Sequence, residues 1–302
     1  MLIVRRIKAE TLHQVEPLAD NQLVTEEAVL RIGRMGLQLV ESSAIWSVAG
    51  MTDPKHPLLT HRPFRAPHHT ASAAALAGGG PLMRPGEISL AHNGVLFMDE
   101  LPEFRRDVLE ALRQPLEDGD VTVARAGGTL HLPARFQLIC AMNPCRCGWR
   151  GHPSGRCRCS DKDVERYVEK ISGPLLDRID LHVSVPSVEY EMMRRRETPE
   201  PSAAVKQRVD KARAIQEARF AGSRTTCNAY MTPAQIKAFC PLDAAGDALM
   251  KNAFTRMGLT ARSHDKVLRL ARTIADLEGE ENISALHLAE AIQYRNTDIL
   301  KS

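Results

Sequence analysis

Two adjacent carboxylates close the short apolar run Val95-Leu-Phe-Met98, which is followed directly by Asp99 and Glu100. Such runs are typical of strands buried in a parallel sheet, and open α/β sheets bind ligands at the carboxyl ends of their strands. A carboxylate pair there suits Mg²⁺ coordination by Asp99 and polarisation of an attacking water by Glu100, as in nucleotide hydrolases. The plainer interpretation is a strand that ends in an acidic turn, because so short a motif also arises by chance.

Two further polar residues lie beside the next two apolar runs, which are residues 136–142 and 179–185. Asn143 follows the second run and could hydrogen-bond the same water or a γ-phosphate, although an Asn-Pro dipeptide also simply starts a turn. Arg178 ends a predicted helix just before the third run, where it could reach a phosphate held by a neighbouring subunit. Its alternative is a surface ion pair with Asp177 or Asp180, which would add little stability.

Four of the seven cysteines lie in one short loop that contains four arginines and no acidic residue. Two close thiol pairs across a loop can supply the tetrahedral ligands of a structural Zn²⁺. In a reducing compartment metal is favoured over disulfide for such clusters, with reduced or redox-active thiols as the alternative. The arginines could offset the charge of a thiolate centre or contact phosphates. The expected ligands are Cys145, Cys147, Cys157 and Cys159, and the arginines are Arg146, Arg150, Arg156 and Arg158.

The remaining candidates favour structural roles. His68 and His69 are adjacent on a loop, and neighbouring histidines rarely converge on one metal ion without further partners. Arg262, Lys266 and Arg269 recur at helical spacing, which by itself predicts a solvated face. The other three cysteines are expected to be buried packing residues: Cys140, Cys227 and Cys240.

Composition limits the classes of function. A chain of 302 residues with 43% hydrophobic residues can bury a substantial core. A net charge of +3 does not indicate a wholesale polyanion binder, so any basic surface must be local. Aromatic residues make up only 4%, which argues against broad stacking platforms for single strands. The longest uncharged stretch, 66–83, is interrupted by Gly, Pro and His and cannot span a bilayer. We therefore expect a cytoplasmic chain with reduced thiols and no membrane partner.

The Pro-rich segment 197–202 separates an α/β region from a helical one. Upstream, besides the apolar runs, the sequence predicts a helix from Thr25 to Val48, a helix over 102–116, and a hairpin of 121–125 with 129–132. Residues 1–24 show no clear period. Downstream it predicts helices that begin near 203, after Thr232 and after Ser284, and one that ends before Gly279.

Taken together, these segments resemble the magnesium-chelatase-like AAA+ ATPases and, within them, the ComM/YifB group. The resemblance covers about residues 44–300 in an ordered set of motifs: 62–70, 95–100, 141–145, 171–180, 259–263, 271–279 and 290–295. It implies that Asp99 and Glu100 form the Walker B motif and that Asn143 is sensor 1. It further implies that Arg178 is the arginine finger and Arg262 is sensor 2. The hairpin matches the pre-sensor-1 insertion of these proteins, and the His68-His69 region matches their helix-2 insertion.

The resemblance also implies the architecture and the partners. We expect an α/β fold: an AAA+ core over 44–196 with a mostly parallel sheet, an all-helical lid over 203–302, and an unmatched segment over 1–43. Members of the group use ATP and Mg²⁺, with nucleotide held between core and lid. They form hexameric rings and act on DNA as branch-migration helicases.

One essential part of the family pattern is missing. A phosphate-binding loop needs a Gly-rich backbone followed by Lys and Ser or Thr, and this sequence contains no Gly-Lys pair. The family places that loop, its strand and a Lon-like domain ahead of the matching region. We therefore expect a sheet that is incomplete at its N-terminal strand, unless residues 1–24 replace that strand, and a truncated chain that cannot hydrolyse ATP alone. Alternatives are a non-catalytic assembly module, a zinc-stabilised DNA-interaction module, or the ATPase subunit of a magnesium chelatase.

Overall fold

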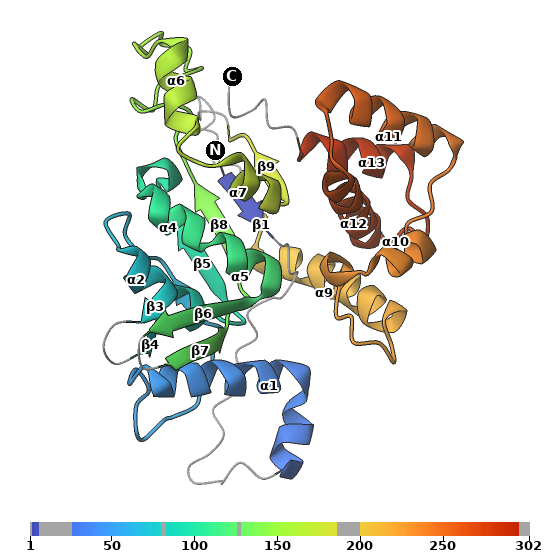
Figure 1. Ribbon diagram of the computed structural model, residues 1–302. Helices are drawn as coiled ribbons and strands as arrows, with labels where there is room; N and C mark the ends of the chain where they lie inside the picture. The colour runs from blue at the N-terminus through green and yellow to red at the C-terminus, as the bar shows by residue number, and fades with distance from the viewer. Residues whose placement is uncertain (1, 6–25, 80–82, 126–127, 186–199, 296–302) are drawn as a thin grey trace. The chain divides into compact units, whose positions relative to one another are not determined.

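The computed structural model describes residues 2–5, 26–79, 83–125, 128–185 and 200–295. The chain forms two compact units, coloured mainly blue to green and mainly orange to red in Figure 1. The α/β unit comprises Leu12–Gly148 and Arg158–Arg178, and the helical unit comprises Met1–Thr11, Trp149–Cys157 and Ile179–Ser302. Within the described ranges, every helix is too short or too polar to cross a membrane.

Three parallel strands form the sheet of the α/β unit: β2 (Phe64–Arg65), β5 (Val95–Met98) and β8 (Gln137–Ala141), in the order β2-β5-β8. The inner residues Leu96 and Met98 have no exposed surface, and Leu138 is 1% exposed. Apolar side chains therefore bury the middle of the sheet, as its near-continuous apolar runs predict. The predicted α/β class and the parallel pairing of β5 with β8 are confirmed.

The start of β5 is fixed by a close backbone approach. A Cβ atom on Gly94 would lie 2.0 Å from the carbonyl oxygen of Pro63, so only glycine fits where the chain enters the sheet. The preceding residue, Asn93, has a left-handed φ of 57° and is buried. Its amide Nδ2 donates to a carboxylate oxygen of Glu41 at 3.0 Å. This network ties the base of β5 to the helix α1 (Glu26–Val48), which occupies the predicted range.

The prediction of one continuous helix over 102–116 is wrong. The structure instead has a short 3₁₀ turn η1 (Leu101–Glu103), then α4 (Arg106–Ala111) and α5 (Arg113–Asp118). Pro115 explains the break, because it has no N–H to donate to the carbonyl of residue 111, where α4 ends. The apolar side chains that recur along this segment are nevertheless all buried: Phe104, Val108, Leu109 and Leu112.

The predicted hairpin is confirmed as β6 (Asp120–Arg125) paired antiparallel with β7 (Gly128–Pro133). It packs against α5 (Figure 1). The other elements of this unit are short: α2 (Ala73–Ala77), β3 (Gly78–Gly79), β4 (Arg84–Pro85), α3 (Glu87–Leu90), α6 (Asp161–Val168) and α7 (Gly173–Arg178).

The helical unit is built from α9 (Ser202–Arg219), η2 (Asn228–Tyr230), α10 (Pro233–Phe239), α11 (Ala244–Met257), α12 (Ala261–Glu278) and α13 (Ala285–Gln293). The hydroxyls of Thr232 and Ser284 accept hydrogen bonds from backbone N–H groups at the starts of α10 and α13. These are the predicted N-caps. Apolar residues of α12, the helix predicted to end before Gly279, lie in the core of this unit, with Val267 and Ala271 fully buried.

A buried ionic group ties three segments of the helical unit together. Asp276 has no exposed side-chain surface and accepts hydrogen bonds from both Arg219 and Arg272. The guanidinium of Arg272, itself 2% exposed, also donates to the carbonyl oxygens of Glu280 and Glu281 beyond the end of α12. Two cations therefore share one carboxylate, and its removal would leave a buried charge without compensation.

The helical unit also contains an antiparallel strand pair, β1 (Leu2–Arg5) with β9 (Leu181–Val183). The third predicted apolar run is thus a strand, and the described part of the unmatched N-terminal segment contributes its partner. Residues 1–24 show no clear period in sequence, yet residues 2–5 form a strand; residues 6–25 lie outside the described residues. β9 is anchored to the end of α13, because the N–H of His182 donates to the carbonyl of Tyr294 at 2.7 Å.

Candidate functional site

The carboxyl edge of the parallel sheet carries the predicted acidic pair. Asp99 and Glu100 follow β5 directly and are both exposed. Met98 is aligned with Cys140 on the parallel neighbour β8, so Asn143, which follows β8 and is also exposed, emerges at the same edge. Three oxygen-bearing side chains are thereby delivered to one end of two adjacent strands, where ligands of α/β sheets bind.

The backbone fixes how this acidic pair is presented. Glu100 has a left-handed φ of 51°, an uncommon conformation for a residue other than glycine. Its N–H donates to Oδ1 of Asp99 at 2.9 Å, which holds the turn and the first carboxylate together. Of these groups, the carboxylate of Asp99 and the side-chain amide oxygen of Asn143 are the hard oxygen ligands that Mg²⁺ prefers. These residues therefore fit a magnesium ion.

His69 is a neighbour of this pair whose position no sequence spacing indicates. Its Nδ1 lies 3.3 Å from Oε2 of Glu100. Its ring packs 4.1 Å, centroid to centroid, from that of His68, and the Nδ1 of His68 lies 2.9 Å from the hydroxyl of Thr70. The sequence favours a structural or pore-insertion role for the two histidines over metal ligation, and none of these roles includes contact with Glu100.

Arg178 is held inside its own unit. Its guanidinium forms an ion pair with Glu117 at the end of α5, and Nη1 donates to the carbonyl of Pro174 at 2.8 Å. The side chain is 13% exposed. The alternative ion pair with Asp177 or Asp180 is therefore wrong. The actual partner, 61 residues away in sequence, is brought close by the packing of α7 against α5.

In the helical unit, the three basic residues of α12 have different surroundings. Lys266 is 11% exposed and its Nζ lies 2.9 Å from Oδ1 of Asp180, while Nη2 of Arg269 donates to the carbonyl of Met231 at 2.7 Å. The predicted solvated face is thus wrong for these two residues. Arg262 is exposed in the first turn of α12, and its contact with nucleotide stays a prediction.

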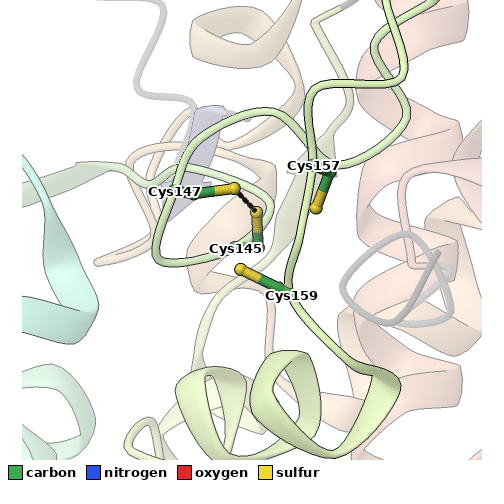
Figure 2. Close-up of side chains that lie close together, drawn as sticks. All are labelled: Cys145, Cys147, Cys157 and Cys159. Atoms are coloured by element: carbon green, nitrogen blue, oxygen red, sulfur yellow. Dashed lines mark hydrogen bonds between the residues drawn. The ribbon is translucent and has the colours of Figure 1, made fainter.

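The cysteine loop brings its four thiols together. The sulfur atoms of Cys145, Cys147, Cys157 and Cys159 all lie within 4.8 Å of one another, and those of the first two are 3.4 Å apart (Figure 2). Four sulfurs around a tetrahedral Zn²⁺ lie about 3.8 Å apart, given Zn–S bonds of about 2.3 Å. The loop is therefore already close to the shape that a metal ion requires. Among the described residues, it is the only such group of His, Cys, Asp and Glu side chains.

The crowding of the thiols affects their ionisation. A hydrogen bond from the backbone of Cys147 lowers the pKa of the Cys159 thiol, but hydrogen bonds among the thiols, desolvation and the charge of Cys145 leave it raised, at about 11. Crowded thiols thus resist ionisation unless a cation compensates their charge. Cys140, Cys227 and Cys240 are buried elsewhere, as predicted. Burial raises the pKa of Cys240 to about 11 and that of Cys140 further, as expected for unreactive packing residues.

The residues that are present suit a metal ion, but they do not suit the triphosphate of a nucleotide. A nucleotide needs a Gly-rich backbone and a lysine around its β- and γ-phosphates, and the sequence has no Gly-Lys pair to provide them. The residues at the sheet edge could hold the divalent cation, but they do not provide a cradle for the phosphates.

Comparison with known proteins gives a consistent assignment. The family model described as magnesium chelatase, subunit ChlI, matches residues 34–193, and the model of the ChlI C-terminal region matches residues 199–295. The chain is 48% identical to competence protein ComM of Haemophilus influenzae over 236 residues, which is 78% of this chain and 45% of that protein. It is 41% identical to the uncharacterized protein YifB of Escherichia coli over 265 residues, 87% of this chain and 51% of that protein.

A more distant similarity reaches DNA replication licensing factor Mcm6 of Drosophila melanogaster, at 24% identity over 73% of this chain and 26% of that protein. The chain spans about half the length of ComM and YifB. The two family models together cover most of the sequence and both structural regions that follow the N-terminal segment. The chain therefore belongs to the magnesium-chelatase ChlI family.

Proposed function

We propose that this chain is the AAA+ ATPase module, from the Walker B strand to the helical lid, of a ring-forming DNA motor similar to ComM. The observation that carries the proposal is the delivery of Asp99, Glu100 and Asn143 to one edge of the parallel sheet. In this role Asp99 would hold Mg²⁺, whose charge would offset that of bound phosphates. Glu100 accepts a hydrogen bond from the attacking water, and Asn143 orients that water or the γ-phosphate.

This chain does not complete that chemistry by itself, because it lacks the phosphate cradle. We propose that it is inactive alone and takes part in hydrolysis only within a ring that includes subunits with that loop. Its contribution there is Arg178, reaching in trans toward the phosphates of a neighbouring subunit. Arg178 must first leave Glu117, and this exchange is accessible because the Glu117 side chain is 43% exposed. An ion pair open to water is weak.

DNA is the preferred partner over a porphyrin–chelatase assembly. Similarity to a protein named as a DNA replication licensing factor supports this choice. So does the cysteine loop, whose four arginines are unopposed by any acid within it. In the same proposal the loop binds a structural Zn²⁺ through Cys145, Cys147, Cys157 and Cys159. A ring of six subunits follows from the family resemblance and stays a prediction.

Complementation in a mixed ring tests the proposal. A variant of Haemophilus ComM that lacks the arginine aligned with Arg178 is mixed with this chain, and DNA-stimulated ATP hydrolysis is measured. The expected result is that the wild-type chain restores hydrolysis and the Arg178→Ala chain does not. Arg105→Ala is the matched control, because Arg105 is an exposed arginine, 71% accessible, paired with Asp107 and outside the site.

Restoration by neither chain, or by both equally, would contradict the role of Arg178. Stimulation by a porphyrin with chelatase partner subunits, in place of DNA, would favour the chelatase alternative. Glu117→Gln should restore hydrolysis at least as well as wild type, because it weakens the ion pair that holds Arg178 in its own unit.

A further inference from the structure

The cysteine loop is shaped by short turns whose glycines adopt conformations that other residues avoid. Backbone hydrogen bonds close the turns Trp149–His152 and His152–Gly155, at N···O distances of 3.2 Å each. Gly151 and Gly155 have φ values of 75° and 62°, and a Cβ atom added to either would meet nothing within 4 Å. Pro153 follows His152 at the position that favours such a turn. On these turns Trp149, Pro153 and Ser154 are exposed to solvent.

Trp149 is the aromatic residue that these turns present. It is 38% exposed, whereas the other tryptophan, Trp46, donates its indole N–H to the carbonyl of Leu90 and packs under Arg65. The guanidinium of Arg156 lies 5.1 Å from the centroid of the Trp149 ring, and the ring of His152 meets it edge-on at 4.9 Å. Low aromatic content argued against a broad stacking platform, but the structure exposes one ring beside a guanidinium.

Every charged side chain of the loop itself, apart from the thiols, is an arginine. Arg146, Arg156 and Arg158 are exposed, and the loop from Cys145 to Cys159 contains no acidic residue. The four arginines of the loop outweigh the two net negative charges that a zinc ion with four thiolates carries. A surface of this kind attracts a polyanion. The exposed ring favours a single-stranded nucleic acid over a duplex, because unpaired bases are free to stack on the ring.

We propose that this loop is a contact surface for single-stranded DNA, with Trp149 stacking on a base and the exposed arginines contacting the adjacent phosphates. The choice of DNA rests on the proposed function, whereas the surface itself rests on the geometry of the loop. Aromatic rings and arginine planes both accept stacked bases, and arginines on one loop can follow a flexible backbone. The four thiols, closed around a metal ion, would keep the turns in this arrangement.

Equilibrium binding of the 302-residue chain to a fluorescein-labelled thymidine oligonucleotide of about 20 nucleotides, at low salt and without nucleotide triphosphate, tests this proposal. Trp149→Ala is expected to weaken binding by about five- to 150-fold, the range measured for loss of one stacked base. Trp149→Phe keeps a ring and should lose less. Binding should quench tryptophan fluorescence in the wild-type chain and not in the Trp149→Phe chain, because Trp46 lies outside the surface.

The arginines give an independent measurement. Combined Arg156→Ala and Arg158→Ala should reduce the slope of log affinity against log salt by about 1.4, from a loss of about 0.7 per phosphate contact. Arg105→Ala, the exposed arginine outside the loop, should change affinity by less than about twofold. Equal metal content and equal thermal unfolding of all variants would show that the loop remains folded.

Several outcomes would overturn the proposal. These are no binding by the wild-type chain, unchanged binding by Trp149→Ala, or an equal loss in Arg105→Ala and in the loop arginine variant. Tighter binding of duplex DNA, or RNA bound more than about tenfold tighter than DNA of the same sequence, would overturn single-stranded DNA as the occupant. The measurement needs no ATP, so failure of the AAA+ role of Asp99 or Arg178 would leave its result unchanged.

Discussion

In the α/β unit, Nδ1 of His69 lies 3.3 Å from Oε2 of Glu100, which is the second carboxylate of the acidic pair at the sheet edge. His69 follows strand β2, and Glu100 follows strand β5 at the same carboxyl edge. Both side chains are partly open to water, at 32% and 49% exposure. The contact therefore orients Glu100 rather than stabilising the fold, and leaves Asp99 as the carboxylate available to a cation.

This arrangement predicts how the sheet edge binds a divalent cation. Asp99→Asn is expected to lower the affinity for Mn²⁺, used in place of Mg²⁺, by at least about tenfold, because a charged oxygen ligand is lost. His69→Ala should not weaken binding and should change the free energy of unfolding by less than about 1 kcal/mol. Electron paramagnetic resonance of free Mn²⁺ measures the affinity. Equal Mn²⁺ binding by Asp99→Asn and wild type would show that the cation binds elsewhere.

The buried carboxylate of the helical unit predicts a large stability effect. Asp276→Asn should lower the free energy of unfolding by about 3–5 kcal/mol, because it leaves the buried guanidinium of Arg272 without its counter-charge. Glu200→Gln is the matched control, since Glu200 also faces an arginine, Arg208, but at 47% exposure. That change should be below about 1 kcal/mol in urea unfolding. Similar losses in both variants would show that Asp276 does not compensate a buried charge.

His182 predicts a pH dependence of stability. Burial, and then the positive charges of Arg295 and Lys266, lower its pKa to about 4, while Asp180 opposes the shift. Both ring nitrogens are buried without hydrogen-bond partners among the described residues. Between pH 6.5 and 4 the unfolded chain therefore binds more protons than the folded one. The contribution of His182 to stability is complete above pH 6.5 and is lost as the pH falls toward 4, by at most about 3 kcal/mol.

Urea unfolding at a series of pH values between 4 and 7.5 checks this sign. His182→Met cannot titrate, so the difference in unfolding free energy between wild type and variant should shrink or reverse as the pH falls. Carboxylates titrate in both proteins, and the subtraction removes their common contribution. A difference that stays constant across this range would mean that His182 is protonated equally in the folded and unfolded chains.

The four-thiol loop predicts that metal removal has a local structural effect. Chain purified without oxygen should carry about one equivalent of zinc, and Cys157→Ser or Cys159→Ser should reduce it strongly. Chelation should expose the thiols to a thiol reagent and lower the melting temperature, because metal binding free energy contributes to folding. Cys227→Ser is the control, since Cys227 is buried outside the loop and should keep the zinc. Absence of stoichiometric metal from the wild-type chain would contradict this prediction.

Local patterns predicted much of the fold. The caps at Thr232 and Ser284, the strand before Asp99 and the hairpin all depend on residues close together in sequence, and all are present. The break at Pro115 shows the limit of periodicity, because apolar spacing continued across a residue that cannot complete the helical hydrogen bonds. The strand at 2–5 was missed because four residues are too few to show a period.

The sequence predicted which residues belong to the candidate site, but it did not predict which residues they contact. Strand ends identified Asp99 and Asn143 because parallel strands deliver their carboxyl ends to one edge. The partners of Glu100 and Arg178 are His69 and Glu117, which lie far away in sequence and meet them only through tertiary packing. No spacing rule links such pairs. Likewise, the cysteine spacing predicted a four-thiol cluster, but the exposure of Trp149 follows from turns that only the structure defines.

The proposed function gives this chain the cation-binding and water-orienting residues of an AAA+ site without a phosphate cradle. The most direct test is equilibrium binding of radiolabelled ATP to the purified 302-residue chain, with and without Mg²⁺. The account predicts no binding tighter than the millimolar range and no difference between the wild-type chain and Asp99→Asn. Micromolar, Mg²⁺-dependent binding that is lost in Asp99→Asn would contradict it, because the chain would then supply a phosphate site of its own.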